Sequence, residues 1–263
     1  MTTPGPGSAW RLLRARHFSI GKTYVHRGRR VGLVLNPKVG STSIRQVFRA
    51  LRTDMPEAER VLNGRFRWLK NARSLPVAPL PDYWHALAHP AEYRFYGFVR
   101  NPYARLKSAW EDKLAYGHET GYPRSIRGRR LRAIRRLCRE HGLAGAGEGE
   151  LIPFDAFVAL LETGDPAMVN HHWDAQADVL LTRQLPYHRL YHIETEFEQG
   201  MAEIFAALGL PPSATRFISS APRNVSTKRA GALYDAQLAG RVLRLYRGDF
   251  EAFGYDPDSW RGQ

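Results

Sequence analysis

Short apolar runs alternate with amphipathic stretches along this chain, and the runs end at polar turns. Residues 31–35 predict a buried strand, and residues 42–51 carry apolar side chains at the spacing of one helix face. Residues 93–99 predict a second strand, and an Asn-Pro pair then opens another amphipathic helix. Because strand, turn and helix occur twice, we predict an α/β fold with a mainly parallel central sheet, flanked by helices and binding a ligand at the carboxyl ends of its strands.

The remaining pattern predicts further helices and one more strand around this sheet. We expect helices at 129–141, 154–162, 197–208 and about 230–253, and a strand at 189–193. Residues 1–28 predict a loosely docked basic arm, and the proline-rich residues 71–82 predict a loop. We therefore predict a single domain over residues 29–263, with a basic, glycine-rich insertion at about 117–150.

Composition narrows the class of protein. No apolar run reaches the length of a bilayer and nothing resembles a secretory signal. The one cysteine, Cys138, cannot form an internal disulfide and is expected to be buried filler, so we expect a soluble protein in the reducing cytoplasm. A net charge of +14 implies anionic partners, which include nucleotides, acidic glycans, nucleic acid and membrane surfaces.

The turn after the first strand has the composition of an anion site. Lys38 and Gly40 precede a helix N-terminus, where unpaired N–H groups and the helix dipole favour negative charge, and residues 41–43 add hydroxyl groups. The Walker A order is absent because the lysine comes before the glycine. Taken alone, the turn also fits an ordinary strand-to-helix connection with a solvated lysine.

The turn after the second strand adds a second candidate phosphate site. Arg100 ends the strand, Ser108 lies about two helical turns further on, and Arg105 lies on a neighbouring face. A guanidinium fork and a hydroxyl beside the first turn would suit another phosphate, which points to a doubly phosphorylated nucleotide. A salt-bridged arginine and a serine tolerated on a helix explain this segment equally well by itself.

Together the two turns resemble motifs of the carbohydrate sulfotransferases, the family that includes heparan sulfate 2-O-sulfotransferases and chondroitin and dermatan 4-O-sulfotransferases. The similar segments are Pro37-Lys38-Val39-Gly40-Ser41-Thr42-Ser43 and Phe98-Val99-Arg100-Asn101-Pro102-Tyr103-Ala104-Arg105-Leu106-Lys107-Ser108-Ala109-Trp110. The resemblance spans about residues 31–255 and implies a P-loop-like sulfotransferase fold. It also implies that 3′-phosphoadenosine 5′-phosphosulfate (PAPS) is the sulfate donor. Asn101 stands where the family often has Asp, and both residues cap helices well.

The resemblance implies a role for each motif. Residues 38–43 would bind the 5′-phosphosulfate, with Lys38 stabilising the departing phosphate, and Arg100 and Ser108 would hold the 3′-phosphate. The basic pair Lys228 and Arg229 would fold over the 3′-phosphate, as basic loops do in some sulfotransferases, although a solvated loop explains the pair equally well.

The acceptor hydroxyl needs a base, and histidine suits this role because its pKa is near neutral. His85 is our first choice, because residues 83–87 resemble the 2-O-sulfotransferase segment that bears a catalytic histidine, and His89 is the second. His171 and His172 are the remaining candidates for the base, and lining the acceptor site or packing against the ring of Trp173 explains them equally well. The histidines lack the spacing of paired metal ligands, so we expect no metal.

We therefore predict a PAPS-dependent sulfotransferase whose partner is a hydroxyl-bearing acceptor, such as an acidic glycan, with no specific nucleic acid and at most peripheral membrane contact. A P-loop-like nucleotide kinase is the alternative, but it requires the missing Walker lysine. A basic protein that binds nucleic acid or a membrane surface is a third hypothesis, supported only by charge.

Overall fold

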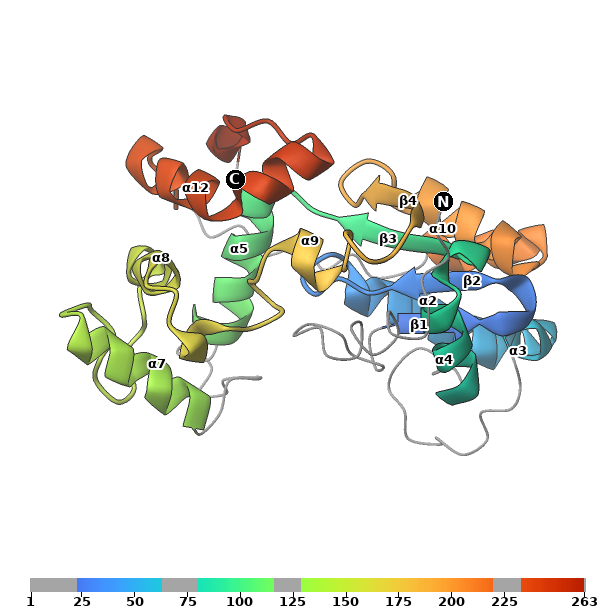
Figure 1. Ribbon diagram of the computed structural model, residues 1–263, viewed down its shortest axis with the longest axis horizontal. Helices are drawn as coiled ribbons and strands as arrows, with labels where there is room; N and C mark the ends of the chain where they lie inside the picture. The colour runs from blue at the N-terminus through green and yellow to red at the C-terminus, as the bar shows by residue number, and fades with distance from the viewer. Residues whose placement is uncertain (1–22, 63–79, 116–128, 220–232, 263) are drawn as a thin grey trace. The chain divides into compact units, whose positions relative to one another are not determined.

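The computed structural model describes residues 23–62, 80–115, 129–219 and 233–262, and the chain forms two compact units. The first unit comprises residues 1–100 and 176–225 and contains the sheet; the second comprises residues 101–175 and 226–263 (Figure 1). The strands of the first unit are β1 (Thr23–His26), β2 (Val31–Val34), β3 (Arg94–Val99) and β4 (Tyr187–His192). Its helices are α2 (Ser41–Asp54), α3 (Pro56–Val61), α4 (Leu80–Ala88), α9 (Gln176–Val179), α10 (Phe197–Leu208) and α11 (Arg216–Ser219).

The sheet has the order β1-β2-β3-β4 in the described part of the chain. β1 runs antiparallel to β2, whereas β2, β3 and β4 are parallel to one another. The predicted α/β fold with a mainly parallel sheet is therefore confirmed. Because β2, β3 and β4 point the same way, the turns that follow Val34, Val99 and His192 all leave from the carboxyl edge of the sheet.

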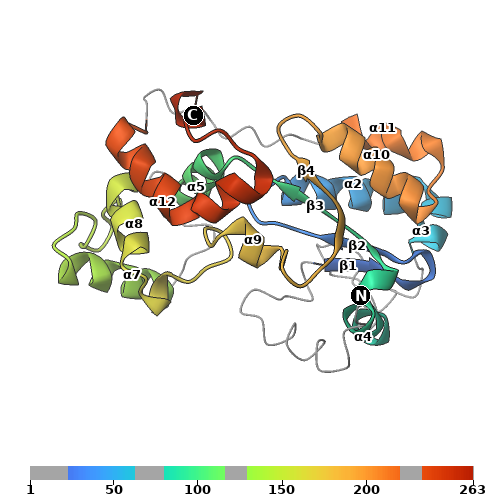
Figure 2. The same ribbon diagram turned by 45° about the horizontal axis from the view of Figure 1, so that its top comes forward.

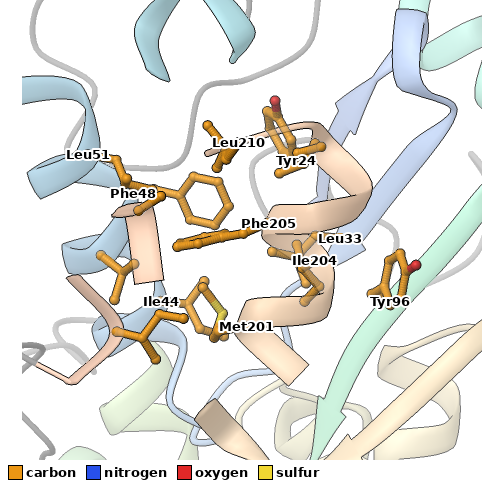
Figure 3. Packing of buried hydrophobic residues seen from close by; sticks show 14 of the residues in the cluster. Tyr24, Leu33, Ile44, Phe48, Leu51, Tyr96, Met201, Ile204, Phe205 and Leu210 are labelled. Atoms are coloured by element: carbon orange, nitrogen blue, oxygen red, sulfur yellow. The ribbon is translucent and has the colours of Figure 1, made fainter. Parts of the chain in front are cut away.

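Helix α2 is fixed to one face of the sheet by the apolar stripe that its sequence predicts. Ile44, Val47, Phe48 and Leu51 are all buried, and Phe48 meets Phe205 of α10 edge to face, with ring centroids 5.9 Å apart. Figure 3 shows the side chains of α2 against those of α10, and Figure 2 shows α11 beside them. Burial of each large apolar side chain stabilises the fold by about 1.5–3 kcal/mol, so α2 and the turn before it are firmly held.

Two segments of the first unit differ from the sequence prediction. Residues 23–26, which we assigned to the basic arm, form the buried strand β1, where Tyr24 packs on Phe48 with ring centroids 5.7 Å apart. Residues 80–82, which we assigned to a proline-rich loop, begin α4 instead. In both places tertiary packing supplies what a short or proline-containing sequence does not signal by itself. Residues 1–22 and 71–79 of the predicted arm and loop lie outside the described residues.

The second unit is built from helices in its described part. They are α5 (Pro102–Trp110), continued by a π-helical turn (Glu111–Ala115), α7 (Arg129–Glu140), α8 (Phe154–Glu162) and α12 (Ala236–Phe253). As predicted, Asn101 caps α5: its Oδ1 accepts from the amides of Tyr103 and Ala104 at 3.0 and 3.3 Å.

Helix α7 lies in the segment predicted as a basic insertion. Its arginines lie mainly on the outer face, while Ile134, Leu137 and Cys138 are buried in the core of the second unit, as expected for Cys138. Residues 117–128 of the insertion lie outside the described residues. None of the described helices combines the length and apolarity needed to cross a membrane.

Candidate functional site

The turn between β2 and α2 has an unusual backbone. Lys38 has a φ of 67° and Gly40 has a φ of 62°, so both occupy the left-handed region. Glycine enters this region easily, but a lysine there costs roughly 1–2 kcal/mol. Strain of this kind persists where the surrounding structure over-determines the backbone, and it is concentrated at functional sites.

Gly40 lets the turn approach the end of β4 closely. A Cβ atom on Gly40 would lie only 2.9 Å from Cδ1 of Ile193. Gly40 is also the N-cap of α2, so the cap residue has no side chain to accept from the first amides of the helix, and the first turn of α2 contains no acidic residue. The positive end of α2 therefore faces the carboxyl edge of the sheet without a competing negative charge from its own first turn.

The remaining residues of the predicted phosphate loop divide into buried and accessible members. Val39 is buried in the core beside α2, so only its backbone can contact a ligand. Ser43 is also buried, whereas Ser41 is half-buried and Thr42 is exposed. The amides and the outer hydroxyls, together with Lys38, therefore form the surface that an anion would meet.

Arg100 joins this turn from the end of β3. Its Nη1 donates to the carbonyl oxygen of Lys38 at 3.1 Å, so the structure brings these two predicted site residues together. A guanidinium group has five N–H donors in a planar fork, a geometry that matches the oxygens of a phosphate. The bond from Arg100 to the carbonyl of Lys38 places this fork beside the lysine turn.

Two buried amide side chains, those of Asn36 and Gln176, connect the turns. Gln176 Oε1 accepts from the backbone amide of Arg100 and from Nδ2 of Asn36, both at 2.9 Å. Its Nε2 donates to the carbonyl oxygen of Arg100 at 2.7 Å. Asn36 Nδ2 also lies 3.3 Å from the carbonyl oxygen of Phe98, to which it donates. Asn36 and Gln176 thus tie the ends of β2 and β3 to each other.

His85 lies away from this edge. Its Nδ1 is 2.9 Å from Nη1 of Arg30 and 3.1 Å from the hydroxyl of Tyr93, and these partners precede β2 and β3. The six residues of β3 lie between Tyr93 and Arg100, so the two are seven steps of about 3.3 Å apart, or roughly 23 Å. The structure therefore does not bring His85 to Lys38, contrary to what we expected for the base.

The surroundings of His85 also oppose a role in proton transfer. Burial lowers the pKa of His85, and the neighbouring Arg30 and Arg27 lower it further. Arginine can only donate, so the ring nitrogen that faces Arg30 must use its lone pair for this bond. His89 belongs to the same edge: its ring centroid lies 4.8 Å from that of His85, and its Nδ1 lies 3.6 Å from Glu92.

Comparison with family models gives one match that covers most of the chain. The model of the sulfotransferase family matches residues 34–256, a range that includes both turns and Gln176. The chain belongs to the sulfotransferase family. Comparisons with curated proteins and with solved structures gave no match.

The second unit of this sulfotransferase carries a histidine pair on an ordered turn. His172 Nδ1 lies 2.7 Å from Oδ1 of Asn170, which also accepts from the backbone amide of His172 at 3.1 Å. An oxygen that accepts from a backbone amide must also be the acceptor for the ring, so Nδ1 of His172 carries the proton. The lone pair of the neutral ring is then on Nε2, which is the tautomer that a base acting through Nε2 requires.

Arg105 stabilises the turn that carries His171 and His172. It is almost fully buried, and it donates to the carbonyl oxygens of His171 and Asp174 at 3.0 and 2.8 Å. The ring of His171 lies against that of His172, with centroids 4.2 Å apart. These contacts give Arg105 a supporting role in the second unit.

The remaining predicted site residues are placed as follows. Ser108 is half-buried on α5 in the second unit, and Lys228 and Arg229 lie outside the described residues. Within the described ranges, no group of three or more His, Cys, Asp or Glu side chains is arranged to hold a metal ion.

Proposed function

We propose that this sulfotransferase transfers the sulfuryl group of PAPS to a hydroxyl group of a carbohydrate. The observation that carries the proposal is the turn at residues 36–40, where a strained lysine and a glycine cap present the amide end of α2 while Arg100 braces the same turn. These groups fit an anionic phosphosulfate in charge, and they offer hydrogen-bond donors rather than acceptors.

When bound, the donor supplies the sulfuryl group and a phosphate leaving group. As the sulfur–oxygen bond to that phosphate breaks, negative charge develops on the bridging oxygen, and the ammonium group of Lys38 and the α2 amides stabilise it. The acceptor oxygen forms the new bond to sulfur, and its proton passes to a base on the protein. Arg100 is proposed to bind the 3′-phosphate through its fork. Ser108 is proposed to bind the same 3′-phosphate, and this role is proposed from the sequence motif alone.

The carbohydrate acceptor is proposed from the likeness of the two motifs to those of carbohydrate sulfotransferases. The positive charge of the chain favours an acidic glycan among such acceptors. Incubation with PAPS and a panel of neutral and acidic glycans, read by mass spectrometry, tests this. A gain of one sulfate on a small non-sugar hydroxyl compound, with none on any glycan, would overturn it.

For the base we propose His172 in place of His85, from the hydrogen bonds of each ring. His172→Gln is expected to lower kcat by about 10²-fold with little change in donor affinity, because proton transfer is lost and donor contacts are not. His85→Gln is the matched control and should leave kcat near the parent value. A loss of turnover in the His85 variant, with the His172 variant active, would reverse the assignment.

Ligand-dependent thermal stability tests the donor class. Adenosine 3′,5′-bisphosphate at about 100 times its Kd should raise Tm by about 5–10 °C, because a ligand that binds only the folded chain stabilises it. ATP with magnesium and duplex DNA are the comparison arms, and DNA is tested at two salt concentrations. Stabilisation by ATP with magnesium but not by the bisphosphate would favour a kinase and reject the proposal.

A further inference from the structure

We propose that Gln176 is a positioning residue, which sets the direction of the Arg100 guanidinium by holding the backbone of Arg100 from both sides. The link to donor binding rests on the proposed function, whereas the clamp itself is a property of the fold. Gln176 is the first residue of α9, and none of its surface is exposed.

The clamp begins where the sheet ends. Val99 is the last residue of β3 to pair with β4, opposite His192, so Arg100 lies one position beyond the ladder. The side-chain amide of Gln176 accepts from the N–H of Arg100 and donates to its C=O, which is what another residue of a neighbouring strand would do. Gln176 therefore extends the ordered backbone of β3 by one residue, at the position that carries the guanidinium.

The same amide links this backbone to the other turn. Gln176 Oε1 also accepts from Asn36, the residue that precedes the Pro37-Lys38 pair, and Arg100 returns a bond to the carbonyl oxygen of Lys38. These hydrogen bonds and the backbone of residues 36–38 form a closed ring of contacts through Gln176, Arg100, Lys38 and Asn36. Because the ring is closed, the direction of the guanidinium and the position of the lysine turn are fixed together.

Asn36 and Gln176 are buried polar residues, and burying the unpaired oxygen of Asn36 lowers the stability of the fold. This cost indicates a role for the pair beyond packing. Asn36 is almost fully buried, and its Oδ1 has no hydrogen-bond partner among the residues that the structure describes. An unpaired buried acceptor is unfavourable, and an apolar side chain of similar size would avoid it. Such departures from the most stable choice are typical of sites where geometry is required for function.

The clamp itself is tested first, without any ligand. Gln176→Met keeps the shape of the side chain and removes its hydrogen bonds. Amide hydrogen exchange at Arg100 should become about 10- to 100-fold faster, because its acceptor is lost, while exchange at Ile44, which bonds to Gly40, should not change. Unchanged exchange at Arg100 would overturn the proposal whatever the ligand of this protein is.

The action through Arg100 is tested by a double-mutant cycle on the Kd for adenosine 3′,5′-bisphosphate. Gln176→Met should raise Kd about 10- to 100-fold in the parent chain, but less than about 3-fold in an Arg100→Lys background, where the fork is already lost. Gln199→Met, at an exposed position on α10, is the matched control and should not change Kd.

Each outcome of the cycle decides a separate question. Equal effects of Gln176→Met in both backgrounds, or no effect in the parent chain, would show that Gln176 does not act through Arg100. A parent chain that fails to bind the bisphosphate would instead reject the proposed donor, and the exchange rate at Arg100 would then decide the clamp alone.

Discussion

Lys38→Ala is expected to lower kcat by about 10³-fold, because it removes the positive charge proposed to stabilise the departing phosphate. The chain should stay folded, because the buried side chains of α2 hold the turn and the hydrogen bonds to the backbone carbonyls of Asn36, Lys38 and Gly40 do not involve the lysine side chain. Steady-state rates with saturating donor and acceptor measure the effect. Activity within about tenfold of the parent would refute the role of Lys38.

The left-handed backbone at Lys38 provides a matched comparison for stability. Lys38→Gly removes the same side chain as Lys38→Ala, but it also relieves the strain of a φ of 67°. We expect the Gly variant to melt about 2–4 °C above the Ala variant, since roughly 1 kcal/mol of strain is released, and both variants should be inactive. Equal melting temperatures would show that Lys38 is not strained. Higher stability in an inactive variant would show that the lysine is kept for function at a cost in stability.

Most of the fold could be predicted because its signals are local. The apolar stripe of α2 and the Asn-Pro start of α5 are determined by neighbouring residues, and the structure has both where they were expected. β1 was not predicted because four residues carry too little periodicity, and its burial depends on Phe48 and on pairing with β2.

The candidate site was predictable only in part. The two turns could be found because strand ends, glycine and helix starts leave a sequence pattern, but Gln176 could not, since a single buried amide has no periodicity. The position of His85 at the amino edge of the sheet could have been predicted from the order of elements along the chain. A parallel crossover must return to the amino edge of the sheet before the next strand begins, and His85 and His89 precede β3 by only a few residues. Chain order alone therefore places both histidines on the edge opposite Lys38.

Arg100→Ala is expected to lower kcat/KM for the donor by about 10³-fold, mainly by raising KM. The substitution removes a charged fork proposed to bind the 3′-phosphate, and it also removes the bond that braces the carbonyl of Lys38. Arg100→Lys should recover part of the loss, because it restores the charge without the planar geometry. Arg94→Ala, at the exposed amino end of the same strand, is the control and should behave like the parent chain.

The pattern of the two constants separates the two contributions of Arg100. If binding the donor is its main role, KM rises while kcat at saturating donor changes little. If bracing the lysine turn dominates, kcat falls in both Arg100 variants and resembles that of Lys38→Ala. Because Gln176 bonds to the backbone of residue 100, which any side chain leaves in place, neither variant should lose the fold. A change in kinetics without a change in far-UV circular dichroism would therefore report on the guanidinium itself, whereas full activity in Arg100→Ala would remove it from the site.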